Sequence, residues 1–390
     1  MTAPGQAGPI YLDHNATTPT DRRVVDAMLP YFTEVFGNPS SVEHVHGNRA
    51  QAAVAKARQQ VAAHLGARDN EIVFTGSCTE ASNIAILGAA RARPDRRHVI
   101  TSAVEHPAVL EPFRQLRREG FEVSIIGVNE HGRVDPGEIA AAIRGDTGLV
   151  SIMGANNEVG TIQPVGAIGE LCDTRGVLFH TDLAQVLAHR KVDVAAEHIH
   201  LASISGHKAY GPKGVGALYV RSRSPRAKLE QTVWGGGQER GLRSGTLAVP
   251  LIVGLGEALA IVGREGPRDA ARLTKMCTEF TERVLQEIDG AVANGHPIER
   301  IPGNTSLSIA GVEPLALMHR LNQVASFSAS SACATDKVET SHVLLAMFGN
   351  TLRARQAFRV SPGRLTTAAE MDTFAAALVN AVRELRRFAA

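Results

Sequence analysis

One lysine of this chain stands where a charged side chain is costly. Lys208 follows the apolar run HIHLASIS and lies beside His207, in a turn rich in glycine and proline. An ammonium group at the end of a buried strand must be paired or used in chemistry. Such a lysine can have a lowered pKa and form a Schiff base with a carbonyl cofactor. The alternative is a surface lysine beside a turn, as we expect for Lys213 in the nearby GPKG sequence.

A pyridoxal phosphate site also needs an acid opposite the pyridine nitrogen, because the protonated ring is the better electron acceptor. Asp182 lies in FHTDLAQ, within an apolar run upstream of Lys208. A carboxylate inside such a run is costly without a cation to pair with. Asp182 is therefore the candidate for this acid, and the alternative is an aspartate that caps the next helix.

The phosphate of such a cofactor needs an anion pocket, for which residues 76–90 are the candidate. GSCTEASNIAILGAA is a turn of small polar residues that opens a helix. Its backbone N–H groups and the Thr79 hydroxyl could hold a phosphate at the positive end of the helix dipole, although any helix N-cap looks similar. No GK[ST] follows, so the turn is not a Walker A loop. His106 could stack on the ring or be structural, and Gln185 and Asn157 could bond the ring oxygen and the substrate.

Two further residues could handle a substrate. Cys333 lies in SFSASSACATDKVETSH, among small polar residues with no strong helix or strand pattern. A cysteine in an exposed loop is a better nucleophile candidate than one in the core. Arg359, in AFRVSPGR, is a candidate clamp for a substrate carboxylate because its planar fork fits two oxygens.

The elements that must position these residues are short apolar runs alternating with helical segments. The strands are expected at residues 71–74, 98–103, 122–128, 149–155, 177–183, 200–205 and 215–220. Helical stretches such as AVLEPFRQLRREG and VGAIGELCDTRG separate them and end in glycine. This alternation predicts an α/β domain with a mainly parallel seven-stranded sheet. Ligands of such sheets lie beyond the carboxyl ends of the strands, where most of the candidate residues fall.

The pattern changes after about residue 263. Residues 249–263 are expected to form a buried helix, and a second long helix is expected over about 267–289. The strand and helix patterns beyond them predict a smaller α+β domain. We therefore divide the chain into a large cofactor-binding domain, residues 15–262, and a small domain, residues 263–390 together with 1–14, which carries the Cys333 loop.

Composition excludes several classes of protein. The 390 residues carry a net charge of +2, with 44% apolar and 21% charged residues, which is typical of a globular protein and indicates no nucleic-acid or membrane partner. The N-terminal MTAPGQAGPI has neither a basic region nor an apolar core, so no signal peptide is expected and the location is predicted to be cytoplasmic. The four cysteines show no zinc spacing and are expected to be free thiols, and no metal site is predicted.

Eight motifs together resemble one family. The segments that carry the resemblance are YLDHNATTP, FGNPSS, VEHPAVLE, NNEVGTIQP, SGHKAYGPKGVGALYV, GGGQERGLRSGT, SSACAT and FRVSPGRLTT. They are similar to those of the cysteine desulfurases, class-V aminotransferase-like enzymes that use pyridoxal 5'-phosphate and have the aspartate-aminotransferase fold (fold type I). The resemblance covers about residues 10–385, and the SSAC segment is similar to the branch whose catalytic loop is mobile.

The resemblance implies a role for each matching position. Lys208 would bind the cofactor covalently, Asp182 would pair with its ring nitrogen, and Gln185 would bond its ring oxygen. His106 would stack on the ring and relay protons. The phosphate would be held by Thr79, Ser205 and His207, with the backbone of Cys78 nearby, and by Thr246 from the neighbouring subunit of a homodimer. Asn157 and Arg359 would hold the substrate carboxylate, with Asn157 also near the cofactor, and Cys333 would accept the sulfur.

The implied reaction removes sulfur from L-cysteine. Lys208, once freed by the substrate, would take the α proton, and the Cys333 thiolate would attack the substrate sulfur. Alanine would leave, and Cys333 would keep a persulfide for transfer to an acceptor protein, a scaffold or a thiolation enzyme. Iron–sulfur cluster assembly and sulfur modification of tRNA or DNA are the pathways that this chemistry serves.

The sequence departs from the family pattern in three places. The cysteine is followed by ATD where Thr and Ser are more usual, and Pro362 replaces a common leucine beside Arg359. The chain ends in RELRRFAA, where housekeeping members carry a longer tail that helps to grip the iron–sulfur scaffold, so a dedicated pathway is expected at least as much. Two other readings stay open. A cysteine or selenocysteine C–S lyase, or an aminotransferase, would not need Cys333, and a non-catalytic adaptor would bind no cofactor.

Overall fold

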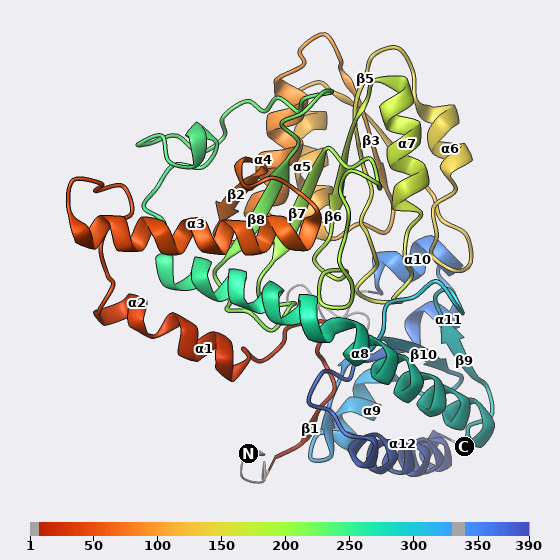
Figure 1. Ribbon diagram of the computed structural model, residues 1–390. Coiled ribbons are helices and arrows are strands. Elements are labelled where there is room, and N and C mark those ends of the chain that lie inside the picture. The colour runs from red at the N-terminus through yellow and green to blue at the C-terminus, as the bar shows by residue number, and fades with distance from the viewer. Residues whose placement is uncertain (1–7, 330–339, 390) are drawn as a thin grey trace.

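The structure is a computed structural model that describes residues 8–329 and 340–389. Cys333 lies outside these residues. The larger part of the chain is built on a seven-stranded sheet in the order β2-β8-β7-β6-β5-β3-β4 (Figure 1). Its strands are β2 (Ile72–Thr75), β3 (His98–Ser102), β4 (Glu122–Ile126), β5 (Thr147–Ser151), β6 (Leu178–Asp182), β7 (Leu201–Ser205) and β8 (Gly216–Val220).

The prediction of a mainly parallel sheet is confirmed. All neighbouring pairs from β4 to β7 are parallel, and only β8 runs antiparallel to both of its neighbours, β7 and β2. The reversal follows from the short connection between β7 and β8, since a parallel neighbour needs a longer crossover. Each predicted strand is present, with ends shifted by up to two residues except where residues 149–155 were expected to extend β5.

Successive residues of the strands enter two different cores. Leu149, Leu178 and Leu201 pack with α4 (Cys78–Arg91) and α5 (Pro107–Arg118). The residues next to them in the strands, such as Val150 and Phe179, pack on the opposite face. That face is covered by α3 (Val45–Leu65), α6 (Pro136–Ala142), α7 (Val165–Arg175) and the first part of α8 (Val249–Glu287). Both sheet faces are therefore buried, which explains the continuous apolar runs of the sequence.

The remaining residues form a second unit with its own core. Its sheet has the order β12-β13-β10-β9 and is antiparallel throughout. The strands are β9 (Ala291–Asn294), β10 (Thr305–Ile309), β12 (Ser328–Ala329) and β13 (Ala357–Val360). Helices α9 (Pro314–Leu321) and α12 (Ala368–Ala389) pack on it with the last part of α8. The N-terminal strand β1 (Ile10–Tyr11) pairs with β11 (Ala325–Ser326), and Leu12 joins this core.

The expectation of two helices between residues 249 and 289 is wrong. The structure has one helix of 39 residues, α8, and Pro267 lies inside it. Val249, Leu259 and Val262 pack in the core of the seven-stranded sheet, whereas Phe280 and Val284 pack in the second core. The division into two domains stays a prediction, and its proposed boundary at residue 262 falls within a continuous helix.

The shorter helices complete the fold around these two cores. They are α1 (Arg22–Met28), α2 (Pro30–Thr33), α10 (His342–Phe348) and α11 (Leu352–Arg355), with two turns of 3₁₀ helix at Asp69–Glu71 and Glu239–Gly241. Within the described residues, no helix is long and apolar enough to span a bilayer.

Candidate active site

A cavity of about 300 Å³ lies at the carboxyl ends of β6 and β7. Its lining contains all of the predicted site residues except Cys333 and Thr246. Those present are Cys78, Thr79, His106, Asn157, Asp182, Gln185, Ser205, His207, Lys208 and Arg359. Asp182 is the last residue of β6 and Ser205 the last of β7. The parallel strands therefore bring together side chains that are far apart in the sequence, as the rule for α/β sheets predicts.

Lys208 is held at its amino group by two backbone oxygens. Its Nζ donates to the carbonyls of Asn15 at 2.5 Å and Ala16 at 2.8 Å. Burial, together with the positive charge of Arg359, lowers the pKa of Lys208 to about 8. A sizeable fraction of the amine is therefore neutral near pH 8, and only the neutral amine is a nucleophile.

Asp182 serves two purposes at the end of β6. Its Oδ1 accepts a hydrogen bond from the backbone N–H of Ala184 at 2.9 Å, and the Cys78 thiol donates to the same oxygen at 3.5 Å. The residues after Asp182 form turns and not a regular helix, so the helix-cap alternative does not hold. The carboxylate closes a turn and also borders the cavity.

Free backbone donors lie at the start of α4. The Ser77 side chain caps this helix by accepting from the N–H of Glu80 at 3.0 Å. The N–H groups of Cys78 and Thr79 have no acceptor in the described part of the chain. Gly216 allows β8 to approach this turn, because a Cβ at that position would lie 2.9 Å from the Cys78 nitrogen. Two unpaired donors at a helix N-terminus form an anion site when they face a cavity.

His207 and Ser205 border the same end of the cavity. The Nδ1 of His207 lies 3.0 Å from the Thr17 hydroxyl. Burial, with the charges of Lys208 and Lys213, lowers the pKa of His207 to about 4, so its ring is neutral at pH 7. A neutral imidazole can donate one hydrogen bond to an anion without adding a charge beside Lys208.

His106 was predicted from the sequence as a site residue, whereas the neighbouring Glu105 was not. His106 caps α5 by accepting from the N–H of Ala108 at 3.1 Å, and burial lowers the pKa of its ring. Glu105, which the sequence did not single out, is fully buried, and burial raises its pKa to about 8. Its Oε1 accepts from the Ser102 hydroxyl at 2.7 Å and from the N–H of Met153 at 2.9 Å. Glu105 is therefore mainly protonated at neutral pH.

Arg359 reaches the cavity from β13, but its guanidinium already has protein partners. Nη1 donates to the backbone oxygen of Asn157 at 2.8 Å, and Nη2 donates to Asp13 at 2.6 Å and to the Ser328 hydroxyl at 3.2 Å. The buried Nε has no partner in the described part of the chain. A substrate carboxylate would have to replace Asp13 or bind through the Nε edge.

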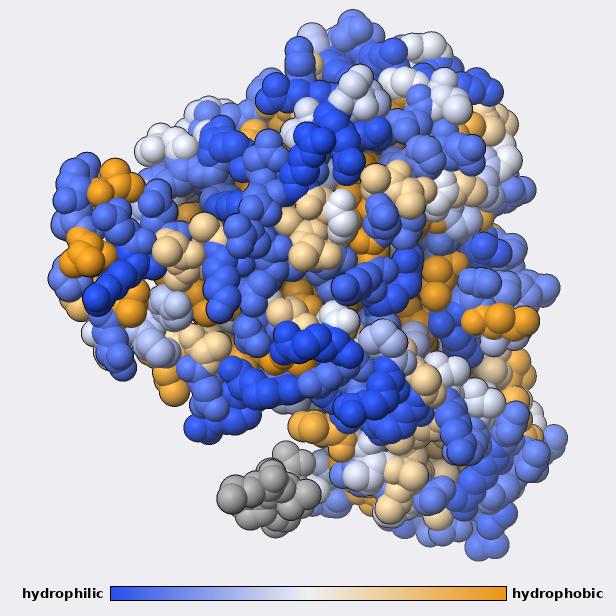
Figure 2. All heavy atoms as spheres, viewed as in Figure 1, coloured by the Kyte–Doolittle hydropathy of each residue, from blue (hydrophilic) through white to orange (hydrophobic). Residues whose placement is uncertain are grey.

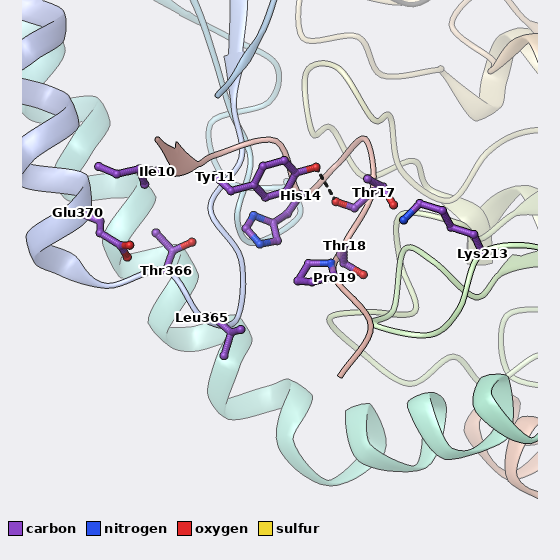
Figure 3. Close-up of a pocket in the computed structure, with 10 residues that line it drawn as sticks. All are labelled: Ile10, Tyr11, His14, Thr17, Thr18, Pro19, Lys213, Leu365, Thr366 and Glu370. Carbon is purple, nitrogen blue, oxygen red and sulfur yellow. Dashed lines mark hydrogen bonds between the residues drawn. The ribbon is translucent and has the colours of Figure 1, made fainter. Parts of the chain in front are cut away.

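The segment of residues 11–19, YLDHNATTP, carries part of the family resemblance, but the sequence assigned it no role in the site. On one side it supplies the carbonyls of Asn15 and Ala16 to Lys208. On the other side, Tyr11, His14 and Thr17 line a second cavity of about 360 Å³ that Lys213 also borders (Figure 3). Its contributions to Lys208 are backbone oxygens, which no side-chain pattern could have revealed.

Lys213 and Thr246 lie at the surface, and Cys333 lies outside the described residues. Lys213 is exposed, as predicted. Thr246 is also exposed in this chain and does not border the cavity that contains Lys208. Its predicted contact with a neighbouring subunit stays a prediction.

Comparisons with known proteins agree on the family. The aminotransferase class-V family matches residues 10–374. A cysteine desulfurase of Mus musculus is 45% identical over 97% of this chain and 82% of the relative. A solved "NifS-like protein" has a TM-score of 0.89 and 34% identity, covering 96% of this chain and 99% of that one. The structure of "SspA in complex with cysteine" has a TM-score of 0.81 and 34% identity, covering 92% and 100%. The chain belongs to the cysteine desulfurases of the aminotransferase class-V family.

Proposed function

We propose that this protein is a pyridoxal-phosphate-dependent cysteine desulfurase that moves the sulfur of L-cysteine to Cys333. The observation that carries the proposal is the cavity at the strand ends, where an amine with a pKa of about 8 lies with a carboxylate and unpaired helix donors. The solved structure of SspA in complex with cysteine, which this chain resembles, supports L-cysteine as the substrate.

The donor set fits pyridoxal phosphate. Lys208 supplies the amine for its aldehyde, and Asp182 supplies a carboxylate for its ring nitrogen. The N–H groups of Cys78 and Thr79, with the side chains of Thr79, Ser205 and His207, fit its phosphate. His106 and Gln185 would hold the ring, and Thr246 of a second subunit would reach the phosphate. When bound, the cofactor accepts the electrons of the substrate α carbon and so weakens the β carbon–sulfur bond.

Lys208 acts as the base in this reaction. Its neutral form accepts the α proton of the substrate at Nζ, and the carbonyls of Asn15 and Ala16 hold that atom in place. They also stabilise the ammonium form that results, since both are hydrogen-bond acceptors. Arg359 orients the substrate through its carboxylate, with Asn157 beside it.

Cys333 is the residue proposed to accept the sulfur. The other three cysteines are poor candidates because each stays protonated. Burial raises the pKa of Cys172 to about 12 and that of Cys277 to about 11. Burial and the Asp182 carboxylate raise the pKa of Cys78 as well. Attack by the Cys333 thiolate on the substrate sulfur breaks the carbon–sulfur bond. Its electron pair stays on the β carbon, which takes up a proton to give alanine, and Cys333 carries the persulfide.

An exposed apolar surface supports the proposed homodimer. Leu29, Phe32, Phe36, Val42 and Val45 are all at least half exposed, and Phe36 is 67% exposed. Figure 2 shows apolar side chains at the left edge of this face, over the connection between α2 and α3. Trp234, in the segment that leads to Thr246, is 72% exposed. Exposed apolar groups of this size are typical of an interface. The further partner would be a protein that accepts sulfur for iron–sulfur assembly or for thiolation of tRNA or DNA.

The first experiment measures alanine formation from L-cysteine in the presence of a thiol reductant. We expect the wild-type protein and Cys172→Ala to form alanine, and Cys333→Ser to lose at least about 100-fold in rate while keeping the yellow cofactor, as loss of a covalent nucleophile predicts. If Cys333→Ser turned over equally well, the protein would be a C–S lyase. If the wild-type protein bound no pyridoxal phosphate, it would be a non-catalytic adaptor, and neither the desulfurase nor the lyase assignment would hold.

A further inference from the structure

One carboxylate ties the start of α4 to a segment that is far away in the sequence. The Oε2 of Glu80 accepts a hydrogen bond from the backbone N–H of Gly76, and its Oε1 accepts from the Nε of Arg243 at 3.0 Å. Arg243 lies 163 residues beyond Glu80 in the chain. The Glu80 side chain therefore joins the turn of residues 76–79, called the phosphate turn below, to residues 233–246, called the bracing segment.

The phosphate turn depends on this support because its backbone would meet the phosphate. Free N–H groups of Cys78 and Thr79 can bind an anion together only while the turn keeps its shape. Gly76, which opens the turn, has no side chain to restrict its backbone. Its N–H donates to Glu80, whose own N–H donates to the Ser77 hydroxyl at 3.0 Å. Glu80 thus holds the turn through both its side chain and its backbone.

The bracing segment is itself fixed to the strand that precedes the turn. Glu239 binds the Arg58 guanidinium at 2.6 Å and accepts from the N–H of Phe74 in β2 at 2.8 Å. Within the segment, Arg243 forms a backbone bridge with Val233. The segment is therefore attached to β2 through Glu239 and to α4 through Arg243, on the two sides of the phosphate turn.

The ion pair between Glu80 and Arg243 is partly shielded from water. Their side chains are 25% and 24% exposed, so the attraction between the charges is screened less than at the open surface. A second ion pair of α4, between Arg91 and Glu119, has side chains that are 27% exposed. It lies at the far end of the same helix and is a matched pair that does not touch the phosphate turn.

We propose that Glu80 and Arg243 are positioning residues for the cofactor phosphate. This inference rests on the proposed function, in which the turn receives the phosphate of pyridoxal phosphate. Neither residue is among the described residues that line the cavity, so both act through the backbone of the turn and not by contact with the phosphate. Arg243 also lies three residues before Thr246, so the ion pair fixes the chain from which the proposed contact with the second subunit starts.

The test compares binding of pyridoxal phosphate and of pyridoxal to the cofactor-free protein, followed by the visible absorbance of the bound ligand. The two ligands share the aldehyde and the ring, so the ratio of their affinities reports the phosphate contacts alone. Glu80→Ala should weaken binding of pyridoxal phosphate at least about tenfold, which is the effect of losing one charged hydrogen bond to the phosphate. The affinity for pyridoxal should change less than about twofold.

Three further variants separate the ion pair from other effects. Glu119→Ala breaks the matched pair and should leave the ratio of affinities within about twofold of the wild type. Glu80→Gln keeps an oxygen for the N–H of Gly76 and should lose less than Glu80→Ala. The double variant Glu80→Gln with Arg243→Gln should lose no more than Arg243→Gln alone, because both break the same ion pair. Circular dichroism verifies that each variant is folded.

Several outcomes would overturn the proposal. One is an unchanged ratio of affinities in Glu80→Ala, and another is an equal loss for both ligands, which would mean general damage to the fold. Additive losses from Glu80→Gln and Arg243→Gln would show that the two residues do not act as a pair. If the wild-type protein bound no pyridoxal phosphate, the proposed function would fail and this inference with it. If the wild type bound it and Glu80→Ala bound it equally well, only this inference would fail.

Discussion

At the scale of single residues, the site depends on how charges and carbonyls surround Lys208. The sequence identified Lys208 and Arg359 from their side-chain chemistry. It could not identify the carbonyls of Asn15 and Ala16, which lie 193 and 192 residues from Lys208, or the contact of Arg359 with Asp13, 346 residues away. Backbone acceptors carry no residue signature, so only the folded chain reveals them.

Removal of the Arg359 charge should raise the pKa of Lys208. Arg359 is the second largest cause, after burial, of the lowered pKa, and its loss would also free Asp13 to stabilise the ammonium form. In the wild-type protein, the rate at which the cofactor-free protein captures pyridoxal phosphate should rise with pH through about 8. We expect the midpoint to move to higher pH in Arg359→Gln.

Arg355→Gln is the control, since Arg355 is a nearby exposed arginine bonded to Asn350. Stopped-flow absorbance gives the capture rates. An unchanged midpoint in Arg359→Gln would show that burial alone sets the pKa of Lys208.

Glu105 should make the folded protein less stable as the pH rises. Its pKa is raised from 4.5 to about 8, so the folded state binds a proton between these values that the unfolded state does not. The contribution of this group is therefore fully present below pH 4.5 and is lost as the pH rises through 8. Glu105→Gln keeps an oxygen for Ser102 and Met153 but cannot ionise.

Between pH 5 and pH 8 the wild type should lose unfolding free energy that Glu105→Gln keeps. The difference between the two proteins should therefore shift in favour of the variant by an amount on the order of a few kcal/mol. Urea unfolding at both pH values measures it. A constant difference between the two proteins would mean that Glu105 is ionised in the folded state throughout this range.

At the scale of secondary-structure elements, histidines link neighbouring strands beneath the site. His180 of β6 lies 2.7 Å from the Ser151 hydroxyl of β5 and 2.9 Å from the Ser203 hydroxyl of β7. His98 of β3 bridges Thr147 of β5 and Ser124 of β4 in the same way. The His180 ring pairs two buried serine hydroxyls, Ser151 and Ser203, that have no other partner in the described part of the chain.

His180→Phe should therefore destabilise the protein by about 2–4 kcal/mol, because it leaves two serine hydroxyls without partners. Chemical unfolding measures the loss. The triple variant with Ser151→Ala and Ser203→Ala removes the unpaired hydroxyls and should recover part of it. If the triple variant were no more stable than His180→Phe, the loss would come from packing of the larger ring.

The sequence predicted these elements better than their connections. Continuous apolar runs bounded by glycine located all seven strands of the large sheet, and the glycine after α7 ends that helix at Gly176 with φ 64°. The direction of β8 and the continuity of α8 were not predicted. A single proline such as Pro267 normally interrupts a helix, but here apolar residues on both sides pack into cores that hold one continuous axis.

At the scale of the whole molecule, buried neutral histidines should make the protein sensitive to acid. Burial lowers the pKa of His180 to about 3 and those of His64, His189, His200 and His207 to about 4. An unfolded histidine titrates near 6.5, so between that value and about 4 the unfolded chain binds more protons. The stability that these neutral rings contribute is therefore fully present above pH 6.5 and is lost as the pH falls through about 4.

At pH 5, unfolding should take up roughly four protons, as the five histidines contribute about one each and Glu105 offsets about one. The slope of the unfolding free energy against pH measures this number. His180→Phe should reduce it by about one, whereas a slope near zero would show that these rings are protonated in the folded state.

The single helix α8 has a mechanical consequence for the site. Lys208 belongs to the seven-stranded part, and Arg359 belongs to the second sheet, yet both border one cavity. Because residues of the single helix α8 pack in both cores, the cores cannot slide past each other along it. Bending of α8 is then the motion that would change the width of the cavity. The weakest point of α8 is Pro267, which has no N–H for the helix ladder and lies between the residues anchored in one core and those anchored in the other. Bending of α8 at Pro267 would therefore change the distance between Lys208 and Arg359 while leaving each core intact.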